Sequence, residues 1–516
     1  MNEKIRRRLA RYKRRIERRL DKRNLQGMER PAFTASNIHY EMADRTRAVA
    51  AGGIGALHLV ARRLGLIEAL DEHLQVLKLH LPYHESDHVL NLAYNALAGG
   101  GCLEHLELLR NDENYLDALG ARRIPDPTTA GDFCRRFEEG HIRTLLSIIH
   151  HTSQRAWKQQ TDPAFFEQAF IDMDGVIVET GGECKQGIAL SYDGRWGYHP
   201  LIVSLANTAE VLSLVNRSGN RPSHEGAAAE ADRAIAVCRE GGFRQIVLRG
   251  DTDFTQTKEL DRWDADGVQF LFGKDNIAPL HLLADDLPDS AWKTLVRPPR
   301  YEVKTEPRGR RENCRLPIVR ERGYDHIRLE WEEVAQMPYR PVACQQAYRL
   351  IVVRKNLSRE EGKGDQRRIF PDYRYFFYLT NDWESTAAEL VLCANDRCDQ
   401  ENLNAQLLGG VRSLKAPLDT LLSNWAYMVM TMLAWNLKAW FALSLPEPSG
   451  RYQEQRREEK RRVLRMEFKT FVNAFVRIPC QIVRTARRLV YRVLAWNPWQ
   501  GVFFRLLDQL ALPLRR

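Results

Sequence analysis

Two aspartates stand two positions apart in an apolar, β-branched stretch of the chain. The stretch FFEQAFIDMDGVIVETGG covers residues 165–182 and contains Asp172 and Asp174. Side chains of a strand alternate between its faces, so both carboxylates project from the same side. A buried carboxylate without a partner is costly, and a purely structural strand would avoid two of them. The facing elements must therefore carry a group that makes these carboxylates tolerable.

Two more acids stand where an α/β sheet presents its ligand edge. Asp251 directly follows the expected strand at residues 245–248, and Glu401 lies inside a helix expected over residues 385–408. Mg²⁺ and Mn²⁺ prefer oxygen ligands. Two such ions, about 3.5–4 Å apart, can hold the attacking and leaving oxygens of a phosphodiester in line. Asp174, Asp251 and Glu401 would supply such a two-ion site, whereas any single aspartate after a strand is more often a cap or turn residue.

Two neighbouring carboxylates have simpler explanations. Asp172 shares a face with Asp174; it either helps to bind metal or is an ordinary carboxylate outside the ligand shell, and we favour the second interpretation. Asp253 is expected to cap a helix that begins at Thr255.

The elements that must position these acids follow an α/β order. Residues 165–275 read as strand, strand, strand, helix, strand, helix, strand. The next segment loses helical periodicity and reads as strands with basic loops, after which a strand and a long helix return. We expect a basic helical DNA-binding region (1–150), the first part of the core (160–275), a β-rich insertion (276–372), the second part of the core (373–445) and a basic helical region (446–516).

The charge is concentrated at the two ends of the chain. The net charge is +10, and residues 1–23 hold twelve Lys and Arg against three acidic residues. Apolar residues recur there every three or four positions, which predicts an amphipathic helix with a basic face. Such a helix is either a solvated charged helix or a phosphate-binding one, and we favour the second. The cations assigned to DNA are Arg6, Arg7, Arg8, Arg11, Lys13, Arg14 and Arg15.

Composition argues against membrane insertion and against a disulfide framework. Residues 421–445 are long and apolar, but they include Asn424, Asn436 and Lys438, so we expect a buried core helix. The nine cysteines are scattered, which is typical of reduced cytosolic thiols. The first residues contain no apolar segment of a signal peptide. We therefore expect a cytoplasmic protein.

A set of ordered blocks gives these acids a family context. IDMDGV, GYHPLIVSLANT, NRPSHEGA, LRGDTDFT, YFFYLTND and NDRCDQEN follow one another between residues 171 and 402. Together they resemble bacterial insertion-sequence transposases of the DDE type. The resemblance covers residues 165–440 and implies an α/β fold: an RNase-H-like core interrupted by a β-rich insertion before the glutamate. It matches Asp174, Asp251 and Glu401 to the three catalytic acids.

The same branch carries a Tyr-x2-Arg-x3-Glu-x6-Lys signature on its last helix, of which half is present. Arg397 and Glu401 fit the Arg and Glu positions, whereas Ala394 and Leu408 stand at the Tyr and Lys positions. Roles attached to the two missing residues cannot be transferred. Arg397 itself either pairs with Glu401 one turn away or holds a DNA phosphate.

The resemblance implies a function and its partners. The expected activity is metal-dependent cleavage at transposon ends and strand transfer into target DNA, by a cut-and-paste route. The expected partners are the element's terminal inverted repeats, target DNA and a second copy of the chain. The alternatives are an inactive, transposase-derived DNA-binding regulator and a nuclease without strand transfer. Tyr378 and Trp383 are either core residues or stacking platforms for an extruded base.

Overall fold

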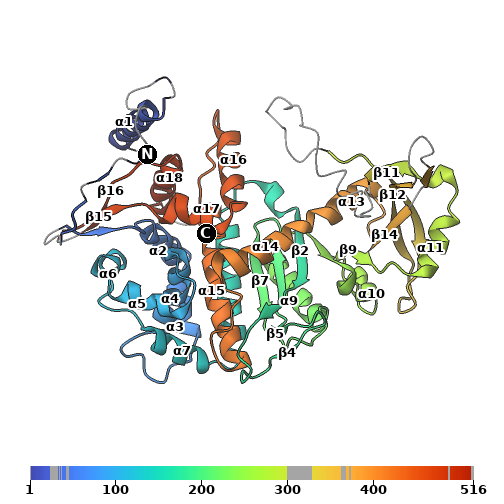
Figure 1. Ribbon diagram of the computed structural model, residues 1–516, viewed down its shortest axis with the longest axis horizontal. Helices are drawn as coiled ribbons and strands as arrows, with labels where there is room; N and C mark the ends of the chain where they lie inside the picture. Colours follow the sequence, from blue (N-terminus) through green and yellow to red (C-terminus); the bar gives the residue numbers. More distant parts are fainter. Residues whose placement is uncertain are drawn as a thin grey trace.

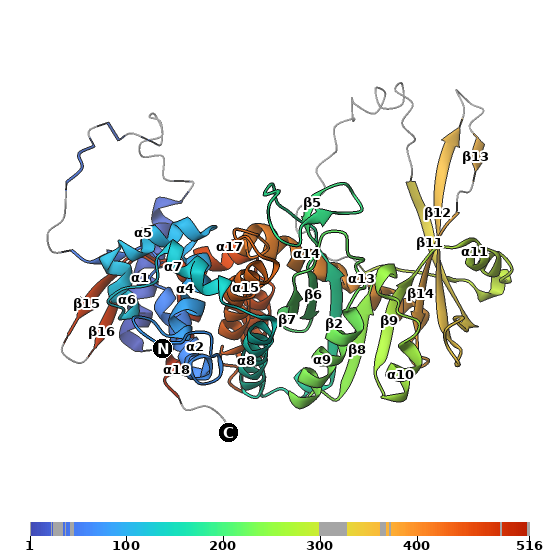
Figure 2. The same cartoon turned by 90° about the horizontal axis from the view of Figure 1, so that it is seen from below.

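A large mixed β-sheet and a body of helices lie next to each other along the long axis of the molecule (Figure 1). The computed structural model describes residues 2–21, 23, 33, 35–36, 38–41, 46–298, 328–361, 368–370, 373–485 and 488–512. Helix α15, from Leu421 to Leu443, runs between the sheet and the helical body (Figure 2). The two halves therefore share one hydrophobic core.

Five strands form the centre of the sheet in the order β7-β6-β2-β8-β9. Strand β2 pairs in parallel with β8, which pairs in parallel with β9; β6 and β7 are antiparallel additions on the other side of β2. This is an α/β fold with the expected RNase-H-like core. The bounds are Gln168–Gly175 for β2, Leu201–Leu205 for β6, Glu210–Val215 for β7, Gln245–Gly250 for β8 and Gln269–Lys274 for β9.

The strand expected at the start of the second part of the core, β14, and the strands expected in the insertion extend this same sheet. β14 pairs with β9, β12 with β14, β11 with β12 and β10 with β11, all antiparallel, and β13 pairs with the end of β12. Their bounds are Lys293–Thr294, Arg328–Tyr339, Tyr348–Glu361, Arg368–Phe370 and Tyr373–Thr380 for β10 to β14. Part of the expected β-rich insertion, including the segment CRLPIVRER at residues 314–322, lies outside the described residues. Helix α11 (Ala278–Asp285) is an unexpected helix in this region, where Leu280 and Ala284, one turn apart, are buried.

Helices cover the sheet and carry parts of the site. α9 (Ala227–Glu240) contacts β2, β6 and β8, and α10 (Leu260–Ala265) contacts β9. α13 (Ala387–Asp396) and α14 (Cys398–Ala405) follow β14, and α14 contacts β2. The single helix expected over residues 385–408 is thus wrong: it is divided at Arg397, and it continues as a π-helix, η5 (Gln406–Val411), that includes Gly409 and Gly410.

The helical body comes from the N-terminal region, as its apolar periodicity indicates. Its helices are α2 (Ile54–Arg63), α3 (Leu66–His73), α4 (Glu85–Ala98), α5 (Leu106–Arg110), α6 (Glu113–Leu119), α7 (Pro127–Arg135) and α8 (Glu139–Trp157). Asp126 caps the start of α7, because its side chain accepts a hydrogen bond from the Thr129 backbone N–H.

Helix α15 is the expected buried core helix, and this prediction is confirmed. It contacts α2, α4, α7 and α8 on one side and β7 on the other, and almost every residue from Ser423 onward is buried. Its polar residues have partners: Asn436 forms two hydrogen bonds with the Val211 backbone, and Lys438 Nζ donates to the Leu464 carbonyl at 2.6 Å. Within the described residues, no helix is long and apolar enough to cross a membrane.

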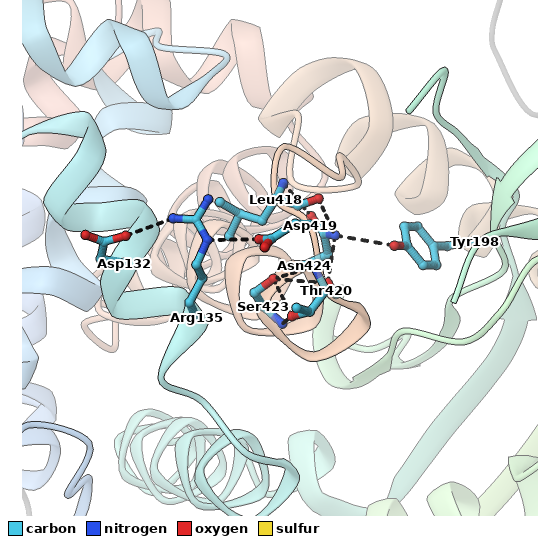
Figure 3. Close-up of polar contacts among 8 residues, drawn as sticks. All are labelled: Asp132, Arg135, Tyr198, Leu418, Asp419, Thr420, Ser423 and Asn424. Carbon is cyan, nitrogen blue, oxygen red and sulfur yellow. Dashed lines mark hydrogen bonds and ion pairs between the residues drawn. The ribbon is translucent and has the colours of Figure 1, made fainter. Parts of the chain in front are cut away.

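A hydrogen-bonded loop fixes the start of α15 (Figure 3). Asn424 donates to the carbonyls of Leu418 and Thr420, at 3.0 and 2.8 Å, and accepts from the Leu418 N–H. Asp419 accepts from Arg135 Nε of α7 at 2.9 Å, and Arg135 also pairs with Asp132. The chain that leaves the helix of Glu401 is therefore anchored to the helical body.

The C-terminal region is only partly helical, which corrects the expectation of a helical tail. Helices α16 (Gln453–Leu464), α17 (Phe468–Phe471), π-helix η6 (Val472–Val476) and α18 (Gln500–Leu510) are accompanied by strands β15 (Cys480–Arg484) and β16 (Leu489–Val493). The two strands form a hairpin, and β1 (Ala48–Val49) pairs with β15. The physical reason is local: Cys480 and Ile482 are buried two positions apart, a period of two that suits a strand.

The basic N-terminal helix is present and exposed. α1 runs from Glu3 to Arg19 and is capped by Asn2. It contacts α18 and has no buried residue. It lies at the end of the molecule away from the sheet (Figure 1).

Candidate active site

Asp172 and Asp174 of β2 face two different arginines. Arg249 of β8 lies in register with Asp172 and binds both of its oxygens, with Nε 2.6 Å from Oδ1 and Nη2 2.8 Å from Oδ2. Both side chains are buried. Arg249 Nη1 also donates to the Cys393 carbonyl of α13 at 2.9 Å. Asp172 is thus the carboxylate of a buried ion pair that joins β2, β8 and α13.

Asp174 is held at the end of β2 by two hydrogen bonds. Its Oδ1 accepts from the Gly175 N–H at 2.9 Å, and its Oδ2 accepts from Asn404 Nδ2 of α14 at 2.8 Å. The second bond joins residues that are 230 positions apart in the chain. It fixes the orientation of this carboxylate against the helix that carries Glu401.

Asp251 stands at the end of β8, beside β2 in the sheet. Its side chain caps the short 3₁₀ turn Thr252–Phe254 by accepting from the Asp253 N–H at 3.0 Å. The expectation that Asp253 caps a helix beginning at Thr255 is therefore wrong, because the turn begins three residues earlier. The other oxygen, Oδ2, is directed toward α14, 3.9 Å from Arg397 Nη2.

All three predicted acids converge on the guanidinium of Arg397. Its nitrogens lie 3.8 Å from Asp174 Oδ2, 3.9 Å from Asp251 Oδ2 and 3.4 Å from Glu401 Oε1. Arg397 is 14% exposed, whereas Glu401 is 61% exposed at the open side of the group. Arg397 Nη1 is buried and has no hydrogen-bond partner in the described part of the chain. The site is therefore a cation surrounded by three carboxylates, with one side accessible.

A polar stripe on α14, missed in the sequence, orients this helix on the sheet. Gln400 and Asn404 lie one turn apart, and Gln400 Nε2 donates to Asn404 Oδ1 at 3.1 Å. Ser204 of β6 donates to Gln400 Oε1. Both amides are buried. Their i,i+4 spacing beside Arg397 is a signal that indicates a polar helix face turned inward.

Burial and like charges shift the protonation of the acids. Burial raises the pKa of Asp174 to about 6; Arg397 opposes this shift, and the carboxylates of Asp251 and Glu401 add to it. Burial also raises the pKa of Asp251, again against the effect of Arg397. Burial and the neighbouring carboxylates disfavour the charged form of these acids, so a positive group among them is needed to stabilise that form.

The oxygens of the three carboxylates are the type of ligand that a hard divalent cation prefers. In the structure, however, the three carboxylates lie farther apart than the ligands of one ion. Mg²⁺ binds carboxylate oxygens at about 2.0–2.1 Å. Among the residues that the structure describes, no group of three acidic, His or Cys side chains is close enough to share an ion. The guanidinium of Arg397 takes the place between the acids.

The other predicted residues lie outside this group. The cations assigned to DNA, Arg6 to Arg15, are on α1 and do not approach the acids (Figure 1). Trp383 is 55% exposed in the turn before α13, whereas Tyr378 packs against the small apolar cluster of Leu271, Ile351 and Val391. Tyr378 is thus a packing residue, and stacking by Trp383 stays a prediction.

Comparisons with known proteins place the chain in a family. Residues 36–513 match the family described as transposase DDE domain, group 1. No curated protein matches the chain. Among solved structures, the piggyBac transposase synaptic complex with hairpin DNA is similar over 89% of this chain and 85% of that chain, with 9% identity and a TM-score of 0.35. Because the family match spans nearly the whole sequence, the protein belongs to the DDE-domain transposases of group 1.

Proposed function

We propose that this transposase cuts DNA at the ends of its own element and joins the freed 3′ ends to target DNA. The observation that carries the proposal is the convergence of Asp174, Asp251 and Glu401 on one cation position. The three residues come from two neighbouring strand ends and one helix. A buried cluster of like charges is unfavourable unless it serves cation binding.

Asp174, Asp251 and Glu401 would hold two Mg²⁺ or Mn²⁺ ions. When bound, these ions supply a lowered pKa for the attacking water or 3′-hydroxyl and neutralise charge on the phosphate. The chain supplies orientation. Asn404 and the Gly175 N–H keep one carboxylate in place, and the Asp253 N–H keeps the next. Glu401 stands at the accessible side, where DNA would enter.

Arg397 has two successive roles in this proposal. In the absence of metal its guanidinium keeps the three acids together. Displaced from the acids, it lies close enough to the reacting strand to bind a phosphate through its planar fork, the alternative that its sequence position leaves open.

The partners follow from charge and from the family. The basic face of α1 would bind phosphates of the terminal inverted repeats, and a DNA-bound homodimer would pair the two ends of the element. We place this activity in the bacterial cytoplasm, on the nucleoid. No membrane partner is proposed.

One reaction distinguishes this function from its alternatives. The full-length protein is incubated with Mg²⁺, a duplex carrying its own element end and a supercoiled target plasmid. Products that join the end to the plasmid support the proposal. Cleavage without joining indicates a nuclease, and binding without cleavage indicates a regulator.

A further inference from the structure

We call Asp174, Asp251 and Glu401 the acidic group. A basic site separate from it lies in a pocket of about 270 Å³ between the helical body and the C-terminal region. Three cations line it: Arg412 after η5, Lys469 in α17 and Arg477 after η6. Asn473 and the glycines at the end of α4 complete the wall. No acidic residue of the described chain is among the lining residues. We call these three cations with Asn473 the basic cradle.

The cations of the basic cradle have no counter-ion among the residues that the structure describes. The side chains of Arg412, Lys469 and Arg477 form neither an ion pair nor a hydrogen bond within those residues. On the neighbouring helix α16, by contrast, Lys460 and Arg457 both pair with Glu447. Unpaired cations that meet in one concave place repel one another and are favourable only with an anion between them.

Two glycines after α4, Gly99 and Gly101, make room for the two arginines. Gly99 ends α4 with a φ of +100°, and a Cβ there would lie 2.7 Å from Arg477 Nη2. A Cβ at Gly101 would overlap Arg412 Nη1. Both guanidinium groups therefore lie directly against the backbone, and a side chain at either glycine would displace the end of an arginine.

Arg412 also has an unfavourable backbone conformation. Its φ is +61°, a left-handed value that non-glycine residues rarely adopt. Glycine would avoid this strain, yet here the chain has an arginine whose side chain lines the pocket. A strained residue held at a concave surface indicates a binding role.

The basic cradle is connected to the acidic group through η5. η5 continues α14, and Gln406 Oε1 of η5 accepts from the Phe468 N–H of α17 at 3.0 Å. Eleven positions separate Glu401 from Arg412, which is about 16 Å if the α-helical rise is applied across α14 and the π-helix η5. α17, α14 and β5 (Trp196–Tyr198) lie along the same side of the molecule, the upper side in Figure 2. One nucleic acid backbone can therefore reach both places.

We propose that the basic cradle binds one backbone phosphate of the element-end DNA, within about five base pairs of the cleaved bond at 3.4 Å per pair. This inference rests on the proposed function. Two arginine forks and a lysine suit a phosphodiester oxygen pair. A free phosphate ion offers the same chemistry, so the test must separate these two sources.

The test compares DNA binding by the wild type and by a variant with Arg412→Asn, Lys469→Gln and Arg477→Gln. Asn is chosen at 412 because it tolerates the left-handed backbone. The matched control is Arg244→Gln, an exposed cation before the opposite end of β8. Affinity for an end duplex is measured without Mg²⁺ over a range of salt concentrations. Phosphate-ethylation interference then maps the phosphates that the protein binds.

We expect the triple variant to bind DNA about tenfold more weakly. The slope of log affinity against log salt concentration should be smaller by about 0.9, the value for one bound phosphate. One interference position close to the cleavage site should disappear, while Arg244→Gln should match the wild type. An unchanged slope and an unchanged interference pattern would overturn the inference. The inference would also be overturned if inorganic phosphate at micromolar concentration bound in the pocket and DNA did not.

Two further measurements keep folding and function apart. Arg412→Gly removes the side chain and the backbone strain together, so it should melt at or above the wild-type temperature and still bind DNA more weakly. Wild-type affinity in this variant would count against the role of Arg412. If the wild type does not bind and cut end DNA, the proposed function is wrong. If the wild type binds and cuts end DNA and the variants do so equally well, the role proposed for the basic cradle is wrong.

Discussion

Asn404 of α14 donates a hydrogen bond of 2.8 Å to Asp174 at the end of β2. This hydrogen bond connects the helix of the third acid to the strand of the first. It is supported from behind by Gln400, which binds Asn404 on one side and Ser204 of β6 on the other. The relative position of two candidate ligands thus depends on a chain of amides that has no charge of its own.

Asn404→Ala should lower the cleavage rate by about 10- to 100-fold, the effect typical of residues that orient a ligand. DNA affinity should stay within about twofold of the wild type, because every phosphate-binding cation remains in place. Asn402→Ala, an exposed neighbour on the same helix, is the matched control. Wild-type cleavage by Asn404→Ala would show that Asp174 needs no support from α14.

Asp251→Asn and Glu401→Gln should each abolish cleavage and joining, while binding of end DNA stays nearly intact. Each substitution removes a carboxylate from the acidic group but leaves the cations of α1 and of the basic cradle in place. Gel assays with Mg²⁺ and binding assays without it separate the two effects. Asp253→Asn should remain active, since only its backbone N–H takes part. Equal loss of binding and cleavage would contradict the catalytic assignment, which stays a prediction until then.

Asp172→Ala should destabilise the fold by about 3–5 kcal/mol, because it leaves Arg249 buried without its counter-ion. The double variant Asp172→Leu, Arg249→Met should lose less than the single one, since it removes both charges. Thermal and urea unfolding measure the difference. Glu107→Ala, which removes an exposed ion pair with Arg110, should leave the unfolding midpoint unchanged. A double variant that is less stable than the single variant would contradict a purely structural role for Asp172 and Arg249.

The raised pKa of Asp174 predicts a pH-dependent effect of Asp174→Asn on stability. The native carboxyl has a pKa of about 6 and the ordinary value is 3.8, so between these values the native state binds more protons. Stability of the wild type therefore falls as pH rises through this window. Asp174→Asn lacks this fall in stability, and it should unfold at a higher temperature than the wild type at about pH 7.5 but not at about pH 4.5.

Asp419→Asn provides a control of opposite sign. A hydrogen bond from Arg135 lowers the pKa of Asp419, so ionisation of this carboxyl favours the native state at neutral pH. Its removal should lower the unfolding temperature slightly at about pH 7.5. Similar shifts for both variants would mean that burial of Asp174 does not govern its ionisation.

Replacing Arg8, Arg11 and Arg15 of α1 with Gln should flatten the salt dependence of DNA binding by about 0.9 for each phosphate that the helix no longer binds. Arg8 and Arg11 form no ion pair among the described residues, so they are free to bind phosphate. Deleting residues 1–23 should give the full effect. Arg244→Gln again serves as the control. An unchanged slope after deletion would make α1 a structural or partner-binding helix.

The sequence by itself determined the local features of this protein. Period-two and period-3.6 patterns indicated β2, β8, α1 and α15, and turn residues placed Asp174 and Asp251 at strand ends. The ordered blocks around these acids indicated the transposase family, which the family match confirmed. Local periodicity failed where one element changes into another, as at Arg397 within the expected helix and at β15 in the expected helical tail.

Only the tertiary structure decided which charges meet. The pairing of Asp172 with Arg249 depends on the register of two strands 77 positions apart, and the bond from Asn404 to Asp174 depends on how α14 lies on β2. The basic cradle joins residues near positions 99, 412 and 477. Such contacts depend on how elements far apart in the chain pack together as they bury their apolar faces, and no short stretch of sequence specifies that packing.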